Sequence, residues 1–342
     1  MEIIYYIGLD IHKKTISYCV KQIDGRIMRH GVVAATRKAL TQWVGSLDRP
    51  WVGAMEATLF TGWVYDFLKP CALELKVAHP EMLKAIAASK KKNDRLDAEK
   101  IADLLRCDLL PECYMAPPEI RELRRVLRYR NLLRREETRL KNKTAGLLME
   151  VGAEYNKKRL HGRKYFEALM GELDEVPTSV KDLLRISRNS LVQFDRLQKG
   201  LLQDLLGHDL IRERVRRLMT IPGVGEVTAL TWVLEIGDPH RFRRVNTVVS
   251  YCGLCSAQME SGGKSRRGPL SKKRNKYLQT VLIEAAKLAP RWNEDVAQVY
   301  ARAIERGHPN NATLAVARKL AAIMLAVDKR GTDYVPAARL AA

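Results

Sequence analysis

Long hydrophobic runs are missing from this sequence of 342 residues. A membrane-spanning helix needs about 18 or more consecutive apolar residues, and no such stretch occurs. The N-terminal residues, MEIIYYIGLD, also lack the layout of a signal peptide. These absences argue against a membrane protein and predict a cytoplasmic location.

Cysteines in a metal-binding arrangement are missing too. The six cysteines are scattered, and a C-x-x-C pair occurs only at Cys252 and Cys255. A structural zinc site needs two further ligands nearby, and none stands at a suitable spacing. We therefore interpret the cysteines as small buried side chains.

Acidic residues are fewer than basic ones in this sequence. Lysine and arginine number 60 against 39 aspartates and glutamates, which gives a formal net charge of +21 and a pI near 9.8. This surplus is larger than solubility requires, so it predicts a polyanionic partner. Nucleic acid is the leading candidate, and an acidic membrane surface is the alternative.

The first hundred residues alternate between strand and helix signals. Strand-like segments occupy residues 3–10, 15–22 and 26–33, and the last two flank Asp24-Gly25, a strong hairpin turn. The next segments predict a helix, a strand, a helix and a strand over residues 37–47, 51–57, 60–69 and 73–80. Two more helices follow, the second over residues 94–106. This order predicts an α/β domain of the RNase H-like type, which we assign to residues 1–116.

A basic helical region follows the adjacent prolines Pro117 and Pro118, which mark a boundary. Residues 121–143 contain ten arginines or lysines and three glutamates. Apolar residues recur every seven positions at Val126, Leu133, Leu140 and Leu147, and again at Leu184, Leu191 and Leu205. Over residues 117–215 the pattern predicts two long helices that pair with each other or across subunits. An ordinary helical hairpin with a solvated basic face explains it equally well.

The third region, residues 216–342, opens with a glycine-containing turn. The segment GVGEVTA, residues 223–229, matches the helix-hairpin-helix pattern G-h-G-x-x-x-A. Gly223 and Gly225 would let backbone amides approach a phosphate, and Ala229 would allow close helix packing. A plain glycine-rich helix connection is the alternative. Three further helices are expected over residues 277–288, 293–306 and 312–327.

Four acids stand at positions where they can converge. Asp10 and Glu56 end predicted strands, and Asp94 and Asp97 share one side of a predicted helix. Buried carboxylates repel one another unless a cation lies between them, and two Mg²⁺ ions about 3.5 to 4 Å apart are a common device for phosphodiester chemistry. Singly, each acid is explained as a surface residue or a helix cap. Together, in a strongly basic chain, they favour a two-metal site.

A serine stands in the basic segment QMESGGKSRRGPLSKKRNK, residues 258–276. Ser261 is followed by six basic residues that we assign to nucleic-acid binding: Lys264, Arg266, Arg267, Lys272, Lys273 and Arg274. A hydroxyl among cations can attack phosphorus, because the charges stabilise the transition state. By composition alone Ser261 is equivalent to its neighbouring serines, so a basic loop that grips a nucleic-acid backbone remains open.

Six segments in this order and spacing closely resemble the DEDD transposases of the insertion-sequence one-ten family, which are relatives of the Piv recombinase. The segments are IGLDIH, MEAT, NDRLDAEKIADLL, IPGVGEVTA, YCGL and ESGGKSRRG, and they span nearly the whole chain. The resemblance implies a RuvC-like N-terminal domain, a coiled-coil linker and a mostly helical transposase domain.

The resemblance also implies a mechanism. The metal-binding acids fall on Asp10, Glu56, Asp94 and Asp97, and the nucleophile falls on Ser261, which would form a phosphoserine link to DNA. A bridge RNA would pair with target and donor DNA, as in other guided systems. The active site would be composite in a dimer or tetramer, and the protein would associate with the nucleoid when active. The segment YCGLCSAQMESGG departs from the family pattern between its two blocks.

Other functions also fit the sequence. A RuvC-like nuclease would resolve Holliday junctions by metal-assisted hydrolysis, with Ser261 structural. A non-enzymatic nucleic-acid-binding protein would use its acids in salt bridges. An actin-like or sugar-kinase fold, which also opens with GLD, would need glycine-rich nucleotide loops that the sequence lacks.

Overall fold

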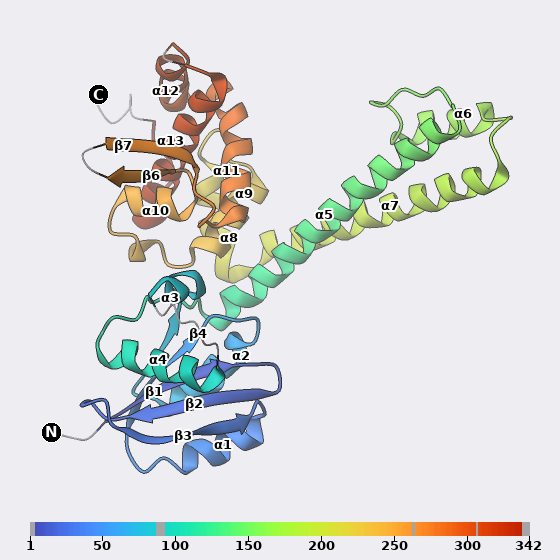
Figure 1. The fold of residues 1–342 in the computed structure, drawn as a ribbon. Coiled ribbons are helices and arrows are strands. Elements are labelled where there is room, and N and C mark those ends of the chain that lie inside the picture. The colour runs from blue at the N-terminus through green and yellow to red at the C-terminus, as the bar shows by residue number, and fades with distance from the viewer. Residues whose placement is uncertain (1–3, 87–92, 262–263, 306, 337–342) are drawn as a thin grey trace. The chain divides into compact units, whose positions relative to one another are not determined.

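Figure 1 shows the computed structural model of the chain, which describes residues 4–86, 93–261, 264–305 and 307–336. The chain forms two compact units, Met1–Pro118 and Glu119–Ala342. Within the described ranges, no helix combines the length and the hydrophobicity needed to cross a bilayer.

The first unit is built on a mixed five-stranded sheet. Its strands are β1 (Tyr5–Ile11), β2 (Thr15–Lys21), β3 (Ile27–Ala34), β4 (Trp51–Glu56) and β5 (Glu74–Ala78). They lie in the order β3-β2-β1-β4-β5, with β1, β2 and β3 antiparallel and with β4 parallel to both β1 and β5. The expectation of an α/β domain that opens with three antiparallel strands is confirmed.

Two helices cover one face of this sheet. They are α1 (Arg37–Gly45) and α2 (Thr61–Leu68), and a short 3-10 helix η1 (Lys69–Cys71) follows α2. Alternation along β1 turns Ile7 and Leu9 toward this face, where they join a core with Leu40 of α1 and Val64 of α2. The Thr36 side chain caps α1 by accepting a hydrogen bond from the Ala39 amide.

The opposite face carries α4 (Asp94–Arg106), preceded in the chain by α3 (Pro80–Ile86). Asn93 caps α4, because its Oδ1 accepts a hydrogen bond from the Arg95 amide at 3.0 Å. The helix backbone lies directly over Gly8 of β1. A Cβ atom at Gly8 would stand 2.0 Å from the carbonyl oxygen of Ala98 and 2.5 Å from the amide nitrogen of Ala102. Only glycine at this position allows α4 to pack so closely.

Two long helices form an antiparallel pair in the second unit (Figure 1): α5 (Pro118–Glu150) and α7 (Thr178–Gly207), with α6 (Arg163–Glu172) between them in sequence. Leu133 and Leu147 are buried along α5, as are Leu184 and Leu191 along α7. The expected pairing of two long helices therefore occurs within the chain. At its middle, Gln198 Nε2 donates to Glu137 Oε2 at 2.8 Å.

The rest of the second unit is mostly helical, as expected. Its helices are α8 (Asp209–Met219), α9 (Glu226–Ile236), α10 (Val245–Tyr251), α11 (Lys276–Leu288), α12 (Glu294–Ile304) and α13 (Pro309–Arg330). Short 3-10 helices η2 (Pro239–Arg241) and η3 (Ala289–Arg291) complete the helical segments among the described residues. The central helix α9 is buried along most of its length, from Ala229 to Ile236.

The basic segment after α10 differs from the expected loop. It forms two antiparallel strands, β6 (Ser256–Ser261) and β7 (Lys264–Leu270), in which Ser261 pairs with Lys264. Two glycines between two strand-length runs are a hairpin signal in the sequence, but the density of positive charge favoured a loop interpretation.

Replacing Gly8 by alanine should destabilise the first unit, because the new Cβ meets helix backbone that no side-chain rotation can move aside. We expect the free energy of unfolding to fall by at least about 2 kcal/mol in chemical denaturation. Gly45→Ala is the matched control, since a Cβ there has nothing within 4 Å. Equal stability of the two variants would show that α4 does not rest on Gly8.

Candidate functional site

Two of the candidate acids lie at the carboxyl ends of neighbouring parallel strands. Leu9 of β1 pairs with Met55 of β4, and Asp10 and Glu56 are the next residues on their strands. Residues at matching positions on parallel strands face the same side of the sheet, so both acids project toward the face covered by α4. Asp10 is buried, with 7% of its surface exposed, and Glu56 is half-buried.

The other two acids occupy the first turn of α4. Asp94 is exposed and Asp97 is half-buried. Because Gly8 lies beneath Ala98 and Asp10 follows two residues later on the same face of β1, the start of α4 is held over the end of this strand. The close contact at Gly8 thus sets the distance between the strand acids and the helix acids.

A histidine joins the strand and the helix. His12 Nε2 lies 3.1 Å from Oδ2 of Asp10 and 3.4 Å from Oδ2 of Asp94. Among the described residues, Asp10, His12 and Asp94 form the group that could hold a metal ion, with one ligand atom of each within 4.8 Å of the others. Glu56 and Asp97 lie outside this group. The Asp97 carboxylate instead accepts a hydrogen bond from Lys100 Nζ at 3.5 Å.

His12 is the residue at this site that the sequence interpretation did not assign. It stands in the segment IGLDIH two positions after Asp10. Residues two apart on a strand face the same side, and this spacing was the available signal. The signal is weak by itself, because only the packing of α4 brings Asp94 to the same point.

Electrostatics at the site favour a cation. Burial raises the pKa of the Asp10 carboxyl, the charges of Asp94 and Asp97 raise it further, and His12 acts in the opposite direction. Ionisation of Asp10 is therefore less favourable in the folded chain than in a carboxyl exposed to water. The donor set, two carboxylates and one imidazole nitrogen, suits a divalent metal ion that would remove this penalty.

The candidate nucleophile lies in the second unit. Ser261 ends β6, and the backbone register pairs Met259 with Arg266 and Gln258 with Arg267. The candidate DNA-binding residues Lys264, Arg266 and Arg267 therefore all belong to β7, the strand that pairs with the serine's own strand.

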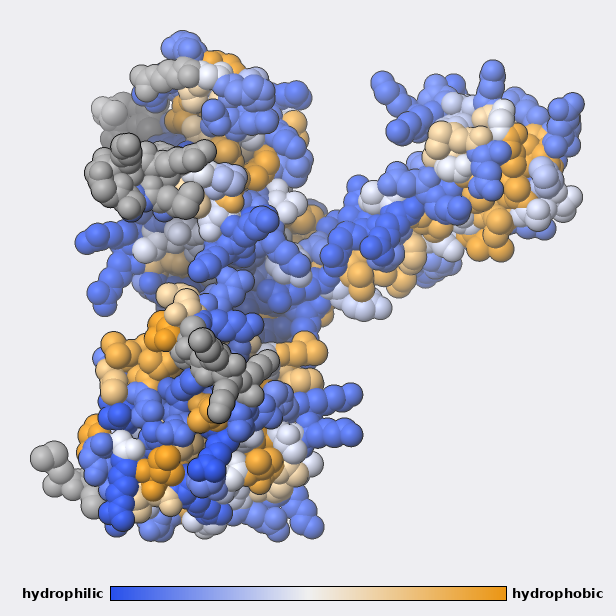
Figure 2. Space-filling view, in the orientation of Figure 1, coloured by the Kyte–Doolittle hydropathy of each residue, from blue (hydrophilic) through white to orange (hydrophobic). Residues whose placement is uncertain are grey.

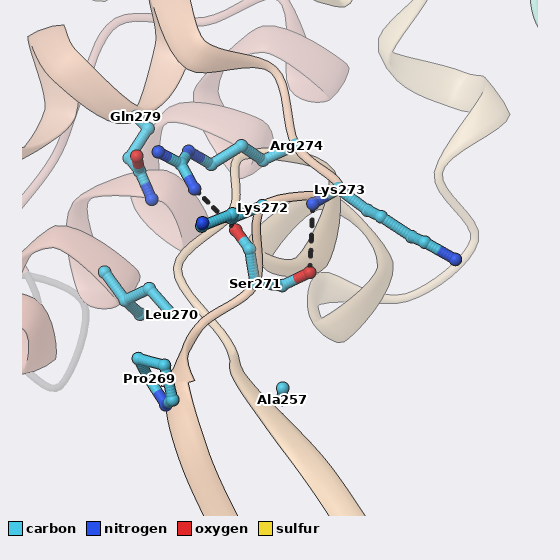
Figure 3. Close-up of a pocket in the computed structure, with 8 residues that line it drawn as sticks. All are labelled: Ala257, Pro269, Leu270, Ser271, Lys272, Lys273, Arg274 and Gln279. Carbon is cyan, nitrogen blue, oxygen red and sulfur yellow. Dashed lines mark hydrogen bonds between the residues drawn. The ribbon is translucent and has the colours of Figure 1, made fainter. Parts of the chain in front are cut away.

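The remaining cations of this segment line a cavity of about 780 Å³ between the hairpin and the start of α11 (Figure 3). The cavity is lined by Ala257, Pro269, Leu270, Ser271, Lys272, Lys273, Arg274 and Gln279. Arg274 Nη1 donates to the Ser271 carbonyl at 2.9 Å, and the Lys273 amide donates to Ser271 Oγ at 3.2 Å. The Arg274 side chain extends toward Gln279, whereas that of Lys273 points away. This arrangement presents positive charge beside an apolar wall.

The candidate helix-hairpin-helix glycines lie between α8 and α9. Gly223 has a φ of +93°, and a Cβ there would stand 2.5 Å from the Cβ of Ala289. Its missing side chain is thus required for internal packing. Gly225 immediately precedes α9, and a Cβ at Gly225 would meet no atom within 4 Å, so its backbone remains open to a ligand.

Further positive charge lines the long helix α5. Figure 2 shows mainly hydrophilic side chains over the visible face of this helix. Arg125 and Arg139 of α5 are exposed, each beside a glutamate three residues earlier. Surface pairs of this kind contribute little to stability, so these arginines remain available to an anionic partner.

Replacing Asp10 by asparagine should stabilise the metal-free protein at neutral pH. The raised pKa means that the folded state favours the protonated carboxyl, so stability is lost as pH rises through that pKa. Divalent metal should favour the unaltered chain over the variant instead. At ten times its dissociation constant, Mg²⁺ should stabilise the unaltered chain by about 1.4 kcal/mol and leave the stability of the variant unchanged. Thermal unfolding with and without Mg²⁺ measures both effects.

The control for this experiment is Asp24→Asn, which changes an exposed acid in the turn between β2 and β3. Its response to Mg²⁺ should match that of the unaltered chain. Equal stabilisation of the Asp10→Asn variant by Mg²⁺ would contradict a metal site at Asp10.

Comparison with known proteins identifies the family. Residues 215–301 match the model described as "Transposase IS116/IS110/IS902 family", and residues 7–152 match the IS110-type DEDD model described as "Transposase".

Relatives align over almost the whole chain. The transposase for insertion sequence element IS1111A of Coxiella burnetii is 28% identical, over 98% of this chain and 92% of the relative. A probable family 20 transposase of Pseudomonas aeruginosa is 27% identical over 96% of this chain and 98% of its own. The transposase for element IS1328 of Yersinia enterocolitica is 24% identical over the same shares. The chain therefore belongs to the IS110 family of DEDD transposases, the enzymes that move insertion sequences.

Proposed function

We propose that this transposase cuts and rejoins DNA strands with a metal centre on Asp10, Glu56, Asp94 and Asp97 and with Ser261 as the nucleophile. The observation that carries the proposal is the meeting of Asp10 and Asp94 at the end of β1. The strand order β3-β2-β1-β4-β5 and the helix over Gly8 also support an RNase H-like, RuvC-like fold for residues 1–116. The divisions at 117–215 and 216–342 complete the proposed domains.

In this mechanism the carboxylates would hold two Mg²⁺ ions, which would supply positive charge to the reacting phosphodiester. Asp10 and Glu56 are fixed by the sheet and Asp94 and Asp97 by the capped helix, so their positions are set before DNA arrives. The Ser261 oxygen forms a bond to phosphorus as the bond to the leaving DNA oxygen breaks. The resulting phosphoserine ester retains the bond energy, and a hydroxyl of another strand later displaces the serine.

Nucleic acid is held by positive charge. The net charge of +21 suits a protein that binds RNA and two DNA duplexes together. The hairpin cations Lys264, Arg266 and Arg267 lie beside the nucleophile in sequence, and those of the cavity begin at Lys272. A bridge RNA that pairs with target and donor DNA would supply sequence recognition, and exchange would pass through a Holliday junction.

Assembly into a dimer or tetramer completes the proposal. The acids and the serine belong to different compact units, and a composite site would combine acids of one subunit with the serine of another. Large apolar side chains remain exposed on one side of α7 in the single chain, at Leu183, Ile186 and Leu197. Such a stripe supports helix pairing between subunits.

A hydrolytic, junction-resolving nuclease is the second candidate function. It is favoured by one observation, that the metal-binding group lies wholly within the first unit and needs nothing from Ser261.

The Ser261→Ala variant separates the two functions. We expect it to lose the covalent protein–DNA adduct and strand exchange entirely, because no oxygen remains to accept the phosphate. Denaturing gel electrophoresis with labelled DNA detects the adduct, and Ser256→Ala, at the other end of β6, is the matched control. Retained cleavage without an adduct would favour hydrolysis.

Replacing both Arg266 and Arg267 by alanine should weaken DNA binding without changing the chosen sequence, because in this proposal both side chains contact phosphates and the guide RNA reads the bases. The slope of log affinity against log salt should become shallower by about one for each phosphate that the variant no longer binds. Binding measured across a salt series, with insertion sites sequenced in parallel, tests this. A shifted target preference would contradict recognition by a guide RNA.

A further inference from the structure

His12 connects two acids that come from different elements. It follows β1 directly, and its backbone is held because the His12 amide donates to the Thr15 carbonyl at 2.9 Å. Its side chain is half-exposed, whereas that of Asp10 is largely buried. The imidazole therefore reaches the two carboxylates from the solvent side of the site.

The distances from His12 Nε2 to the two carboxylate oxygens match those between neighbouring ligands on one ion. Divalent ions of this size bind their ligands at about 2.0 to 2.2 Å, so neighbouring ligands in an octahedron lie about 3 Å apart. His12 Nε2 lies 3.1 Å from the Asp10 oxygen and 3.4 Å from the Asp94 oxygen. An ion could bind all three atoms with small side-chain movements.

A nitrogen ligand changes which ion is preferred. Mg²⁺ binds oxygen and seldom imidazole, whereas affinity for mixed nitrogen and oxygen sites rises along the first-row transition metals from Mn²⁺ to Co²⁺. Glu56 and Asp97 supply oxygen only. The two metal positions of the proposed centre would therefore differ in chemistry.

We propose that His12 Nε2 is a direct ligand of the ion held by Asp10 and Asp94, and that it makes this position selective for a first-row transition-metal dication over Mg²⁺. The inference rests on the proposed metal centre and adds a ligand and an ion preference to it.

The test measures metal binding by the full-length chain, without DNA and without any activity assay. Pulsed electron paramagnetic resonance of bound Mn²⁺ should show the magnetic coupling of a directly bound nitrogen. Calorimetric titrations with Co²⁺, Mn²⁺ and Mg²⁺ should rank affinity in that order at the His12 position.

The His12→Ala variant should lose the nitrogen coupling and bind Co²⁺ and Mn²⁺ at least about tenfold more weakly, since even the partners of metal ligands contribute this much. Its affinity for Mg²⁺ should change by less than about threefold. The His12→Asp variant restores an oxygen ligand and should bind Mg²⁺ while losing the preference for Co²⁺. His30→Ala, which removes an exposed histidine from β3 of the same unit, is the matched control and should bind as the unaltered chain does.

The outcomes separate this inference from the proposed metal centre. If Asp10→Asn abolishes metal binding while His12→Ala changes neither the coupling nor the affinities, the centre stands and the role of His12 is wrong. If Asp10→Asn leaves metal binding intact, the proposed metal centre is wrong, and the proposed role of His12 is wrong as well. Thermal unfolding of each metal-free variant verifies that the fold is retained, so that a loss of binding reports on the ligand.

Discussion

The close packing of α4 on Gly8 is the contact on which the candidate metal site depends. At Gly8, in the middle of β1, the backbone of α4 occupies the space that a side chain would need. Ala98 and Ala102 of α4 are fully buried at this contact. A second link holds the same helix, because the buried Lys21 of β2 donates to Glu99 and Asp103 of α4 at 3.1 and 2.8 Å. Burial acts to lower the pKa of Lys21, and the hydrogen bonds to its two partners outweigh that effect. Lys21 therefore stays charged beneath α4, and its two hydrogen bonds hold the helix in one orientation about its axis.

The second unit uses a buried acid in a comparable way. Glu235 of α9 is 1% exposed and accepts two hydrogen bonds from Arg128 of α5, both at 2.9 Å. It also accepts one from Asn275 at 2.8 Å, and Asn275 caps α11 just after the cations that line the cavity. One carboxylate therefore ties the long helix to the segment proposed to bind nucleic acid. Arg128 itself is partly exposed, so the junction depends on the burial of Glu235 and on its several hydrogen bonds more than on the ion pair alone.

The two units divide the chemistry of a transposase between them. The first holds the acids that we propose to bind a divalent ion. The second provides cations, a hairpin whose first strand ends in Ser261 and an exposed apolar stripe along α7.

Local pattern in the sequence was sufficient for most of the architecture. Alternating apolar residues around Asp24-Gly25 predicted the opening strands, and the seven-residue spacing of Leu133 and Leu147 predicted a paired helix, because both signals arise from neighbours along the chain. The same signals placed Asp10 and Glu56 at strand ends and Asp94 on a helix. The many positive charges of residues 258–276 say little about backbone conformation, so the hairpin that contains Ser261 was not predicted.

Tertiary structure decided the rest. The sequence does not state that Gly8 lies under a helix more than eighty residues away in the chain, and this contact is what brings His12 and Asp94 within reach of one another. Gly223 also has a packing role that the sequence did not show, since its missing side chain makes room for Ala289. Periodicity reveals which way a side chain faces, whereas the distance between two side chains is set by how closely distant backbones can pack.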